Sequence, residues 1–153
     1  MTLLEQVQAA TAAAMRAHDE RRRDALRMAV NALQGAQKTA RRPLTDDESL
    51  AVLSREVKTR RESLDAFRAG GRDDLAAQEA GALEVLAEFL PAPLDEADLD
   101  RLVGEAIAES GASSPRDLGR VMKLLSPRVR GRADGRAVSE RVTRALAASE
   151  RGG

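Results

Sequence analysis

The sequence predicts an all-α protein of two parts, an N-terminal four-helix bundle or pair of helical hairpins and a small three-helix C-terminal domain. Helix formers such as Ala, Leu, Glu and Arg dominate the 153 residues, and the only aromatic residues are two phenylalanines, so strand-favouring residues are scarce. Apolar residues recur at helical spacing in seven successive segments. Pro91 and Pro93 remove two backbone donors between the fourth and fifth segments, which predicts an extended link there.

The N-terminal helical domain is expected over residues 1–90. Thr2 and Thr45 are each followed three residues later by Glu, a capping-box pattern that predicts the start of the first and third helices. The second helix should run from the neighbourhood of His18 to residues 41–42, because Pro43 disfavours α conformation in the residue before it. We expect the third helix to stop at glycines 70–71 and the fourth to run from residue 73 up to Pro91.

Apolar stripes mark the side of each helix that should be buried. The stripes comprise Leu4, Val7, Thr11 and Ala14; Leu26, Ala29, Val30, Leu33 and Ala36; Leu50, Leu53, Val57, Leu64 and Phe67; and Leu75, Ala82, Leu83, Leu86, Phe89 and Leu90. Arg60 and Arg61 fall where the third stripe calls for an apolar residue. If either arginine turns inward, we expect it to have a carboxylate partner.

The C-terminal part is divided into a proline linker over 91–93, a helical domain over 94–149 and a frayed tail over 150–153. Its first helix should span about 95–110 and end at Gly111. Ser114 and Pro115 predict an N-cap with proline at the first helical position, and Pro127 is expected to end that helix. Residues 128–135 are predicted to form a tight loop before a last helix that buries Val138, Val142, Ala145 and Leu146.

Charge is distributed unevenly although the whole chain is neutral. Residues 1–94 carry 14 basic and 15 acidic residues, a net charge of −1. Residues 95–111 carry one basic and six acidic residues, a net −5, and residues 112–153 carry ten basic and four acidic residues, a net +6. This pattern indicates a local anion-binding surface on the tail.

Seven basic side chains within 21 residues are the candidate nucleic-acid-binding residues: Arg116, Arg120, Lys123, Arg128, Arg130, Arg132 and Arg136. The first three are spaced to share one helix face, and the next three alternate through the glycine-containing loop. Arginine forks match phosphate geometry, and glycine permits close backbone approach, so a phosphate-backbone site is predicted. A solubilising surface is the alternative interpretation of the same residues.

Residue types that carry catalysis or metal binding are scarce. The chain has no cysteine and one histidine, His18, which is interpreted as a helix-boundary residue because it lacks an orienting partner. Acid pairs at 46–47 and 73–74 are explained by first-turn capping. No phosphate-loop or dinucleotide-binding motif is present. We therefore predict no catalytic residue, no metal and no cofactor, and a cytoplasmic protein with neither a signal peptide nor a membrane span.

Several stretches resemble the YqeY family over nearly the whole chain. They are LSREVKTRRESL over 53–64, FRAGGRDDL over 67–75, EVLAEFLP over 84–91, GRVMK over 119–123 and GRADGR over 131–136. The C-terminal half of that family is similar to the tail domain of the B subunit of glutamyl/aspartyl-tRNA amidotransferase. In that enzyme the tail helps to hold tRNA, while catalysis lies elsewhere.

The resemblance implies a tRNA-related role, with the seven basic residues as candidates. It also implies the family label of carbon–nitrogen ligase with glutamine as amido donor. We interpret the chain as a non-catalytic accessory protein that binds tRNA or related structured RNA. Two alternatives stay open: a protein–protein adaptor that docks on a tRNA amidotransferase or synthetase, and an enzyme that takes part in amide transfer.

Overall fold

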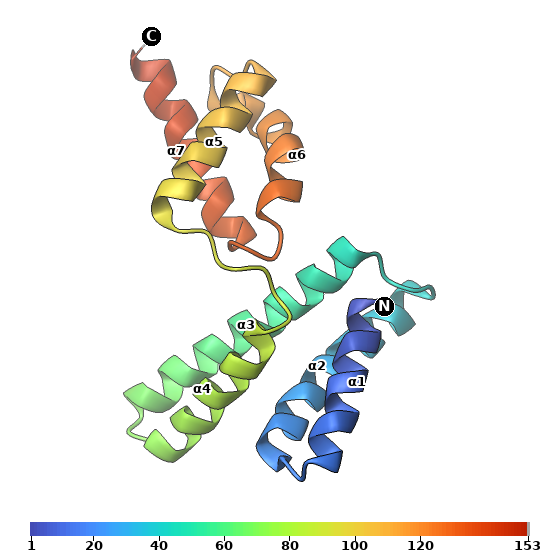
Figure 1. Ribbon diagram of the computed structural model, residues 1–153. Coiled ribbons are helices and arrows are strands. Elements are labelled where there is room, and N and C mark those ends of the chain that lie inside the picture. The colour runs from blue at the N-terminus through green and yellow to red at the C-terminus, as the bar shows by residue number, and fades with distance from the viewer. Residues whose placement is uncertain (153) are drawn as a thin grey trace. The chain divides into compact units, whose positions relative to one another are not determined.

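The computed structural model describes residues 1–152, and within that range it contains seven α-helices, one short 3-10 helix and no β-strand (Figure 1). The all-α prediction is therefore confirmed. The chain divides into two compact units, Met1–Pro91 (the first unit) and the residues from Ala92 onward (the second unit). Each unit has its own apolar core and is described by itself.

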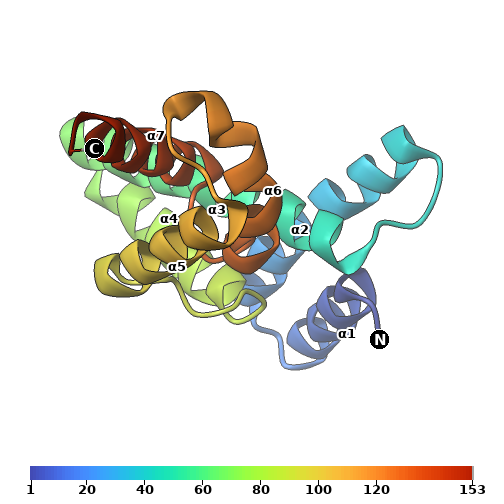
Figure 2. The same cartoon turned by 90° about the horizontal axis from the view of Figure 1, so that it is seen from above.

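The first unit consists of two helical hairpins. The first hairpin is formed by α1 (Leu3–Arg16) and α2 (Glu20–Ala40), and the second by α3 (Asp46–Ala69) and α4 (Asp73–Ala87). Figures 1 and 2 show α1 beside α2 and α3 beside α4, and α2 also packs on α3 and α4. Paired hairpins are thus the observed form of the bundle.

Capping boxes and left-handed residues determine where the helices of this unit begin and end. Both predicted capping boxes are present, because the Thr2 and Thr45 hydroxyls accept from the backbone N–H of Glu5 and Glu48, whose carboxylates accept in return. Arg41 closes α2 in the left-handed region at φ 57°. Gly71, at φ 71°, turns the chain out of α3.

The core of the first unit is formed by one side of each helix. Its buried members are Leu3, Val7, Ala14, Leu26, Ala29, Leu33, Val52, Leu53 and Leu86. Arg60 lies at the edge of this packing between α3 and α4, and Glu56 and Glu79 lie within 3.5 Å of it. The expectation that an inward arginine would have a carboxylate partner is confirmed, whereas Arg61 is exposed.

The fourth helix is shorter than predicted. It ends at Ala87, and the next three backbone N–H groups donate to carbonyls three residues earlier, which is a tighter turn than the α-helix makes. Phe89 and Leu90 therefore reach the core from a turn. The physical reason is Pro91, which disfavours the α conformation of the residue before it and so ends the regular helix early.

The second unit packs α5 (Glu96–Ser110), α6 (Leu118–Val129) and α7 (Gly135–Gly152), with the 3-10 helix η1 (Pro115–Asp117) leading into α6. Asp95 caps α5, and Gly111 ends it at φ 69°. The core members of this unit are Leu99, Val103, Ala106, Val121, Leu125, Val129, Val138, Val142 and Leu146.

Two sequence expectations are corrected in this unit. Pro127 does not end its helix: it lies inside α6, which continues to Val129. The proline lacks the N–H that would bond to the carbonyl of Lys123, but Val129 is 3% exposed and its burial favours another half turn. The loop is consequently limited to residues 130–134. Residues 150–152 continue α7, and Gly153 lies outside the described residues, so fraying of the tail over 150–153 stays a prediction.

None of the described helices combines the length and apolar character that a membrane crossing requires.

Candidate nucleic-acid interface

The seven predicted basic residues are spread over four consecutive elements of the second unit. Arg116 belongs to η1, and Arg120, Lys123 and Arg128 belong to α6. The loop holds Arg130 and Arg132, and α7 begins just before Arg136. The seven side chains therefore have different surroundings, and they differ in whether a ligand could reach them.

The outer face of η1 and α6 carries the most available cations. Arg116, Arg120 and Lys123 are exposed, whereas Val121 and Leu125 are fully buried on the opposite side of α6. Arg120 and Lys123 thus lie on the exposed side of α6, whereas Arg116 stands on the 3-10 turn before the helix. Within the described residues, the side chains of Arg116 and Lys123 have no hydrogen bond or ion pair.

Arg120 forms an ion pair with a carboxylate just before the start of its own helix. Its Nη2 lies 2.7 Å from Asp117 Oδ1, and its side chain is 59% exposed. Backbone N–H donation from Ser113, followed by the bond from Arg120, lowers the pKa of Asp117. Asp117 is thus held as an anion by its own loop and still leaves most of Arg120 open to solvent.

Arg128 belongs to the packing between α5 and α6. Its Nη2 donates to Glu109 Oε2 at 2.7 Å. This hydrogen bond and the neighbouring negative charge raise the pKa of Arg128, and the same bond lowers the pKa of Glu109. A phosphate ligand would have to compete with this carboxylate, so Arg128 is a weaker candidate than the sequence indicated.

The loop arginine Arg132 binds the beginning of its own unit. Its Nε donates to the carbonyl of Ala92 at 3.2 Å, and its carbonyl accepts from the N–H of Leu94 at 3.0 Å. Gly131 precedes it at φ 76°, a conformation that favours glycine. The geometry of this loop is therefore explained by anchoring of residues 92–94.

The last two predicted residues also have defined environments. Arg130 is half-buried, and its N–H closes α6 by donating to the carbonyl of Ser126 at 3.0 Å. Arg136 is 84% exposed and lies 3.5 Å from Glu140, one turn along α7. At that exposure the pair contributes little, so Arg136 remains open to a ligand.

Arg141 is an arginine whose role sequence reasoning missed. It lies on α7 with a side chain 22% exposed, and it donates to Asp100 at 2.5 Å and also to Glu96, both from α5. These bonds raise the pKa of Arg141, Glu96 being the larger cause. The acidic segment over 95–111 was the available signal that cations from elsewhere in the unit pack against it, but it does not indicate which arginine pairs with which carboxylate.

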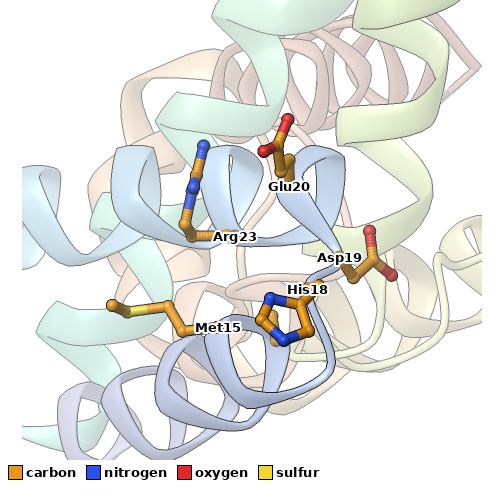
Figure 3. Close-up of a pocket in the computed structure, with 6 residues that line it drawn as sticks. Met15, His18, Asp19, Glu20 and Arg23 are labelled. Atoms are coloured by element: carbon orange, nitrogen blue, oxygen red, sulfur yellow. The ribbon is translucent and has the colours of Figure 1, made fainter.

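His18 lies beside a small cavity of about 130 Å³ in the turn between α1 and α2 (Figure 3). Figure 3 shows the Asp19 and Glu20 carboxylates pointing away from the imidazole ring, and Asp19 Oδ1 accepts from the N–H of Arg22 as the N-cap of α2. With φ 56°, His18 is a turn residue, as expected. In residues 1–152 no three His, Asp or Glu side chains cluster closely enough to hold a metal ion.

Comparison with known proteins identifies the relatives of this chain. The family model described as Yqey-like protein matches residues 4–146. The chain belongs to the YqeY family. It is 29% identical over 151 residues to altered inheritance of mitochondria protein 41, mitochondrial, of Pyrenophora tritici-repentis, a match that covers 95% of this chain and 82% of that protein. It is also 32% identical over 66 residues to an uncharacterized protein of Schizosaccharomyces pombe, covering 43% of this chain and 54% of the other.

The YqeY match extends across both units of the structure. It begins in α1 and ends in α7 at Leu146, a fully buried member of the second core. The segment GRADGR, which carried part of the resemblance, forms most of the loop that holds residues 92–94 and the first turn of α7. In this YqeY protein the segment therefore has a structural role, because it holds residues 92–94 and begins α7.

Proposed function

We propose that this YqeY protein is a non-catalytic accessory protein whose second unit binds the phosphate backbone of tRNA or a related structured RNA. The observation that carries the proposal is the outer face of η1 and α6. Arg116 and Lys123 are exposed there and have no acidic partner within residues 1–152, and Arg120 is mostly exposed beside them. The tRNA-holding tail domain that this half resembles supports the same ligand. A cytoplasmic location is part of the proposal.

The spacing on this face suits a nucleic-acid backbone. Side chains three residues apart on a helix, such as Arg120 and Lys123, have Cβ atoms about 5–6 Å apart. Flexible basic side chains at that spacing reach neighbouring phosphates of one strand. The two phenylalanines both lie in the first unit, and Phe89 packs into its core, so the second unit offers no ring for base stacking. Shape and phosphate recognition follow from this composition.

A salt titration of tRNA binding tests the proposal. The double variant Arg116→Gln, Lys123→Gln should bind total tRNA more weakly, and its plot of log K against log salt should be shallower by about 1.4 to 1.8, because each lost phosphate contact removes about 0.7 to 0.9. The matched control is Arg144→Gln, Arg151→Gln, which removes the same charge from exposed positions of α7 that have no partner in the described residues.

Three outcomes distinguish the possibilities. A shallower slope for the first variant alone supports the proposed face. Equal slopes for both variants would mean that only the total positive charge of the protein affects tRNA binding. The assigned face would then be wrong. If the unaltered protein does not bind tRNA at about 0.1 M salt, RNA binding itself is wrong.

A protein–protein adaptor is the second candidate function, and one feature of the first unit favours it. An open groove of about 520 Å³ lies between the C-terminal half of α2 and the N-terminal half of α3. Small and apolar residues line most of it, including Ala36, Leu44 and Val52. Copurification with a tRNA amidotransferase or synthetase from nuclease-treated lysate would support the adaptor.

Glutamine-dependent ligase activity is the remaining alternative, implied by the family label alone. The chain has no cysteine, and the side chains around His18 do not converge on it. We therefore propose no reaction for this protein. Formation of a glutamine- and ATP-dependent amide product by the pure chain would contradict this assignment.

A further inference from the structure

The outer face of α2 carries a continuous stripe of cationic and amide side chains. Between Asp24 and Asp46 the sequence has no acidic residue, although elsewhere acidic residues are frequent. Within this stretch four helical residues recur at intervals of three or four, which places them on one side of the helix, and Arg41 follows them as the C-cap residue. The α2 stripe consists of Arg27, Asn31, Gln34, Lys38 and Arg41, and all five are exposed.

No carboxylate pairs with the three cations of the stripe in residues 1–152. Arg22, Arg23 and Arg42 of the same helix and its following turn pair with Glu88, Asp24 and Glu48. By contrast, Arg27 has only a weak 4.0 Å contact to the sulfur of Met15, and neither Lys38 nor Arg41 has a side-chain ion pair in residues 1–152. The amides of Asn31 and Gln34 likewise make no hydrogen bond there.

Helix stabilisation explains only part of this arrangement. Cations in the last turn favour the negative end of the helix dipole, which accounts for Lys38 and Arg41. Arg27 lies in the first half of α2, where the dipole gives it no such role, and amides carry no charge to interact with the dipole. Something beyond the stability of α2 is therefore needed to explain the whole stripe.

We propose that the α2 stripe is a second RNA-backbone-binding surface, located on the first unit and separate from the face of η1 and α6. The inference rests on the proposed function, since it assigns the same class of ligand to another part of the chain. Side chains of Arg, Lys, Asn and Gln are the groups that contact phosphate and sugar oxygens. The stripe extends about 20 Å along the helix, enough to follow several nucleotides of one strand.

RNA fits the stripe better than an acidic protein helix does. A helix that docks on the stripe would need an apolar seam under its carboxylates, and none of the five stripe residues is apolar. The apolar groove lies on the side of α2 that faces α3, and no stripe residue lines it. A sugar–phosphate backbone needs no apolar contact, and it presents acceptors for the two amides as well as charge for the three cations.

The test uses the full-length protein and total tRNA as the probe. The triple variant Arg27→Gln, Lys38→Gln, Arg41→Gln should weaken binding and make the plot of log K against log salt shallower by about 2 to 2.7. The matched control is Arg16→Gln, Arg61→Gln, Arg68→Gln, which removes three exposed cations of the same unit that have no ion pair among the described residues. Melting curves of both variants verify that the helices remain folded.

The outcomes separate this inference from the proposed face of the second unit. A slope change in the stripe variant but not in the control supports the stripe, even if the Arg116 and Lys123 variant binds normally. If tRNA binding and its slope are the same in the stripe variant and the control, the stripe inference is wrong, while the second-unit face is judged by its own variant. Failure of the unaltered protein to bind tRNA overturns both.

Discussion

Arg60 of α3 donates a hydrogen bond to Glu79 of α4 at 3.3 Å, so a charged pair joins the two helices of the second hairpin. The carboxylate of Glu56, one turn earlier on α3, lies 3.5 Å from Arg60 Nε. The three side chains are only 15–24% exposed. One guanidinium therefore neutralises part of the charge of two half-buried carboxylates.

Removing this guanidinium should destabilise the first unit. Arg60→Met leaves Glu56 and Glu79 without their shared cation, and we expect the free energy of unfolding to fall by about 1–3 kcal/mol. Urea denaturation followed by circular dichroism measures the change. Arg61→Met, at an exposed position of the same helix, should change it by less than about 0.5 kcal/mol. Equal effects of the two substitutions would contradict the assigned role of Arg60.

The pairing of Glu48 with Arg42 should make stability depend on pH in acid. Arg42 donates two hydrogen bonds to the Glu48 carboxylate, at 2.8 and 2.9 Å. This pairing, together with the N–H and hydroxyl of Thr45, lowers the pKa of Glu48 from 4.5 to about 2. Because the folded pKa is the lower one, the stabilisation is complete above pH 4.5 and is lost as the pH falls toward 2.

The matching variant is Glu48→Gln, which cannot ionise. Its melting temperature should decline less than that of the unaltered protein between pH 4.5 and 2, the range that the two pKa values define. Arg42→Gln should also flatten the decline, since it removes the largest cause of the lowered pKa. If the melting temperatures of all three proteins decline equally over this pH range, the pair of Arg42 and Glu48 does not cause the acid dependence.

Replacement by alanine of two glycines in the segment GRADGR should have different effects on the stability of the second unit. Gly131 has φ 76°, so Gly131→Ala should cost about 1–2 kcal/mol. Gly135 is the first residue of α7, its φ is not positive, and nothing lies within 4 Å of where a Cβ would be. Gly135→Ala should therefore be neutral or stabilise the second unit by up to about 1 kcal/mol. Thermal melts of the two variants measure the difference in stability. Equal losses of stability would argue against the left-handed conformation of Gly131.

Arg141 should contribute to the attachment of α7 to α5. Arg141→Ala removes the cation that pairs with Glu96 and Asp100, and because both carboxylates are mostly exposed we expect a small loosening of α7 from α5 and no large loss of stability. Amide hydrogen exchange of α7 residues reports this loosening. Arg144→Ala, an exposed neighbour, is the control and should leave exchange unchanged. Similar exchange in both variants would mean that apolar packing alone holds α7.

Most of the helical framework could be predicted from local sequence. The capping boxes at Thr2 and Thr45 and the left-handed Gly111 are determined within a few residues, and the structure places them as predicted. Pro127 was misjudged because its local cost competes with the burial of Val129, which depends on helices that are distant in sequence. Tertiary burial overrode a local signal there.

The candidate site was less predictable than the fold, because the availability of an arginine depends on its partners. Arg128 pairs with Glu109, 19 residues away, and Arg141 with Asp100, 41 residues away, and no local pattern indicates either pair. Charge spacing could predict the shared face of Arg120 and Lys123, since a helix fixes it. It could not separate side chains that are open to solvent from those already bound.

The bonds of Arg132 determine where the chain could be cut without damage to the second unit. Ala92 and Leu94 are held by Arg132, 40 and 38 residues later in the sequence, so these first residues are structural parts of the second unit. A protease that cleaves before Pro91 would release a fragment that retains both bonds. Cleavage after Leu94 would remove them and expose the loop from 130 to 134. Limited proteolysis should therefore give a C-terminal fragment that keeps both bonds only when the fragment begins at or before Ala92.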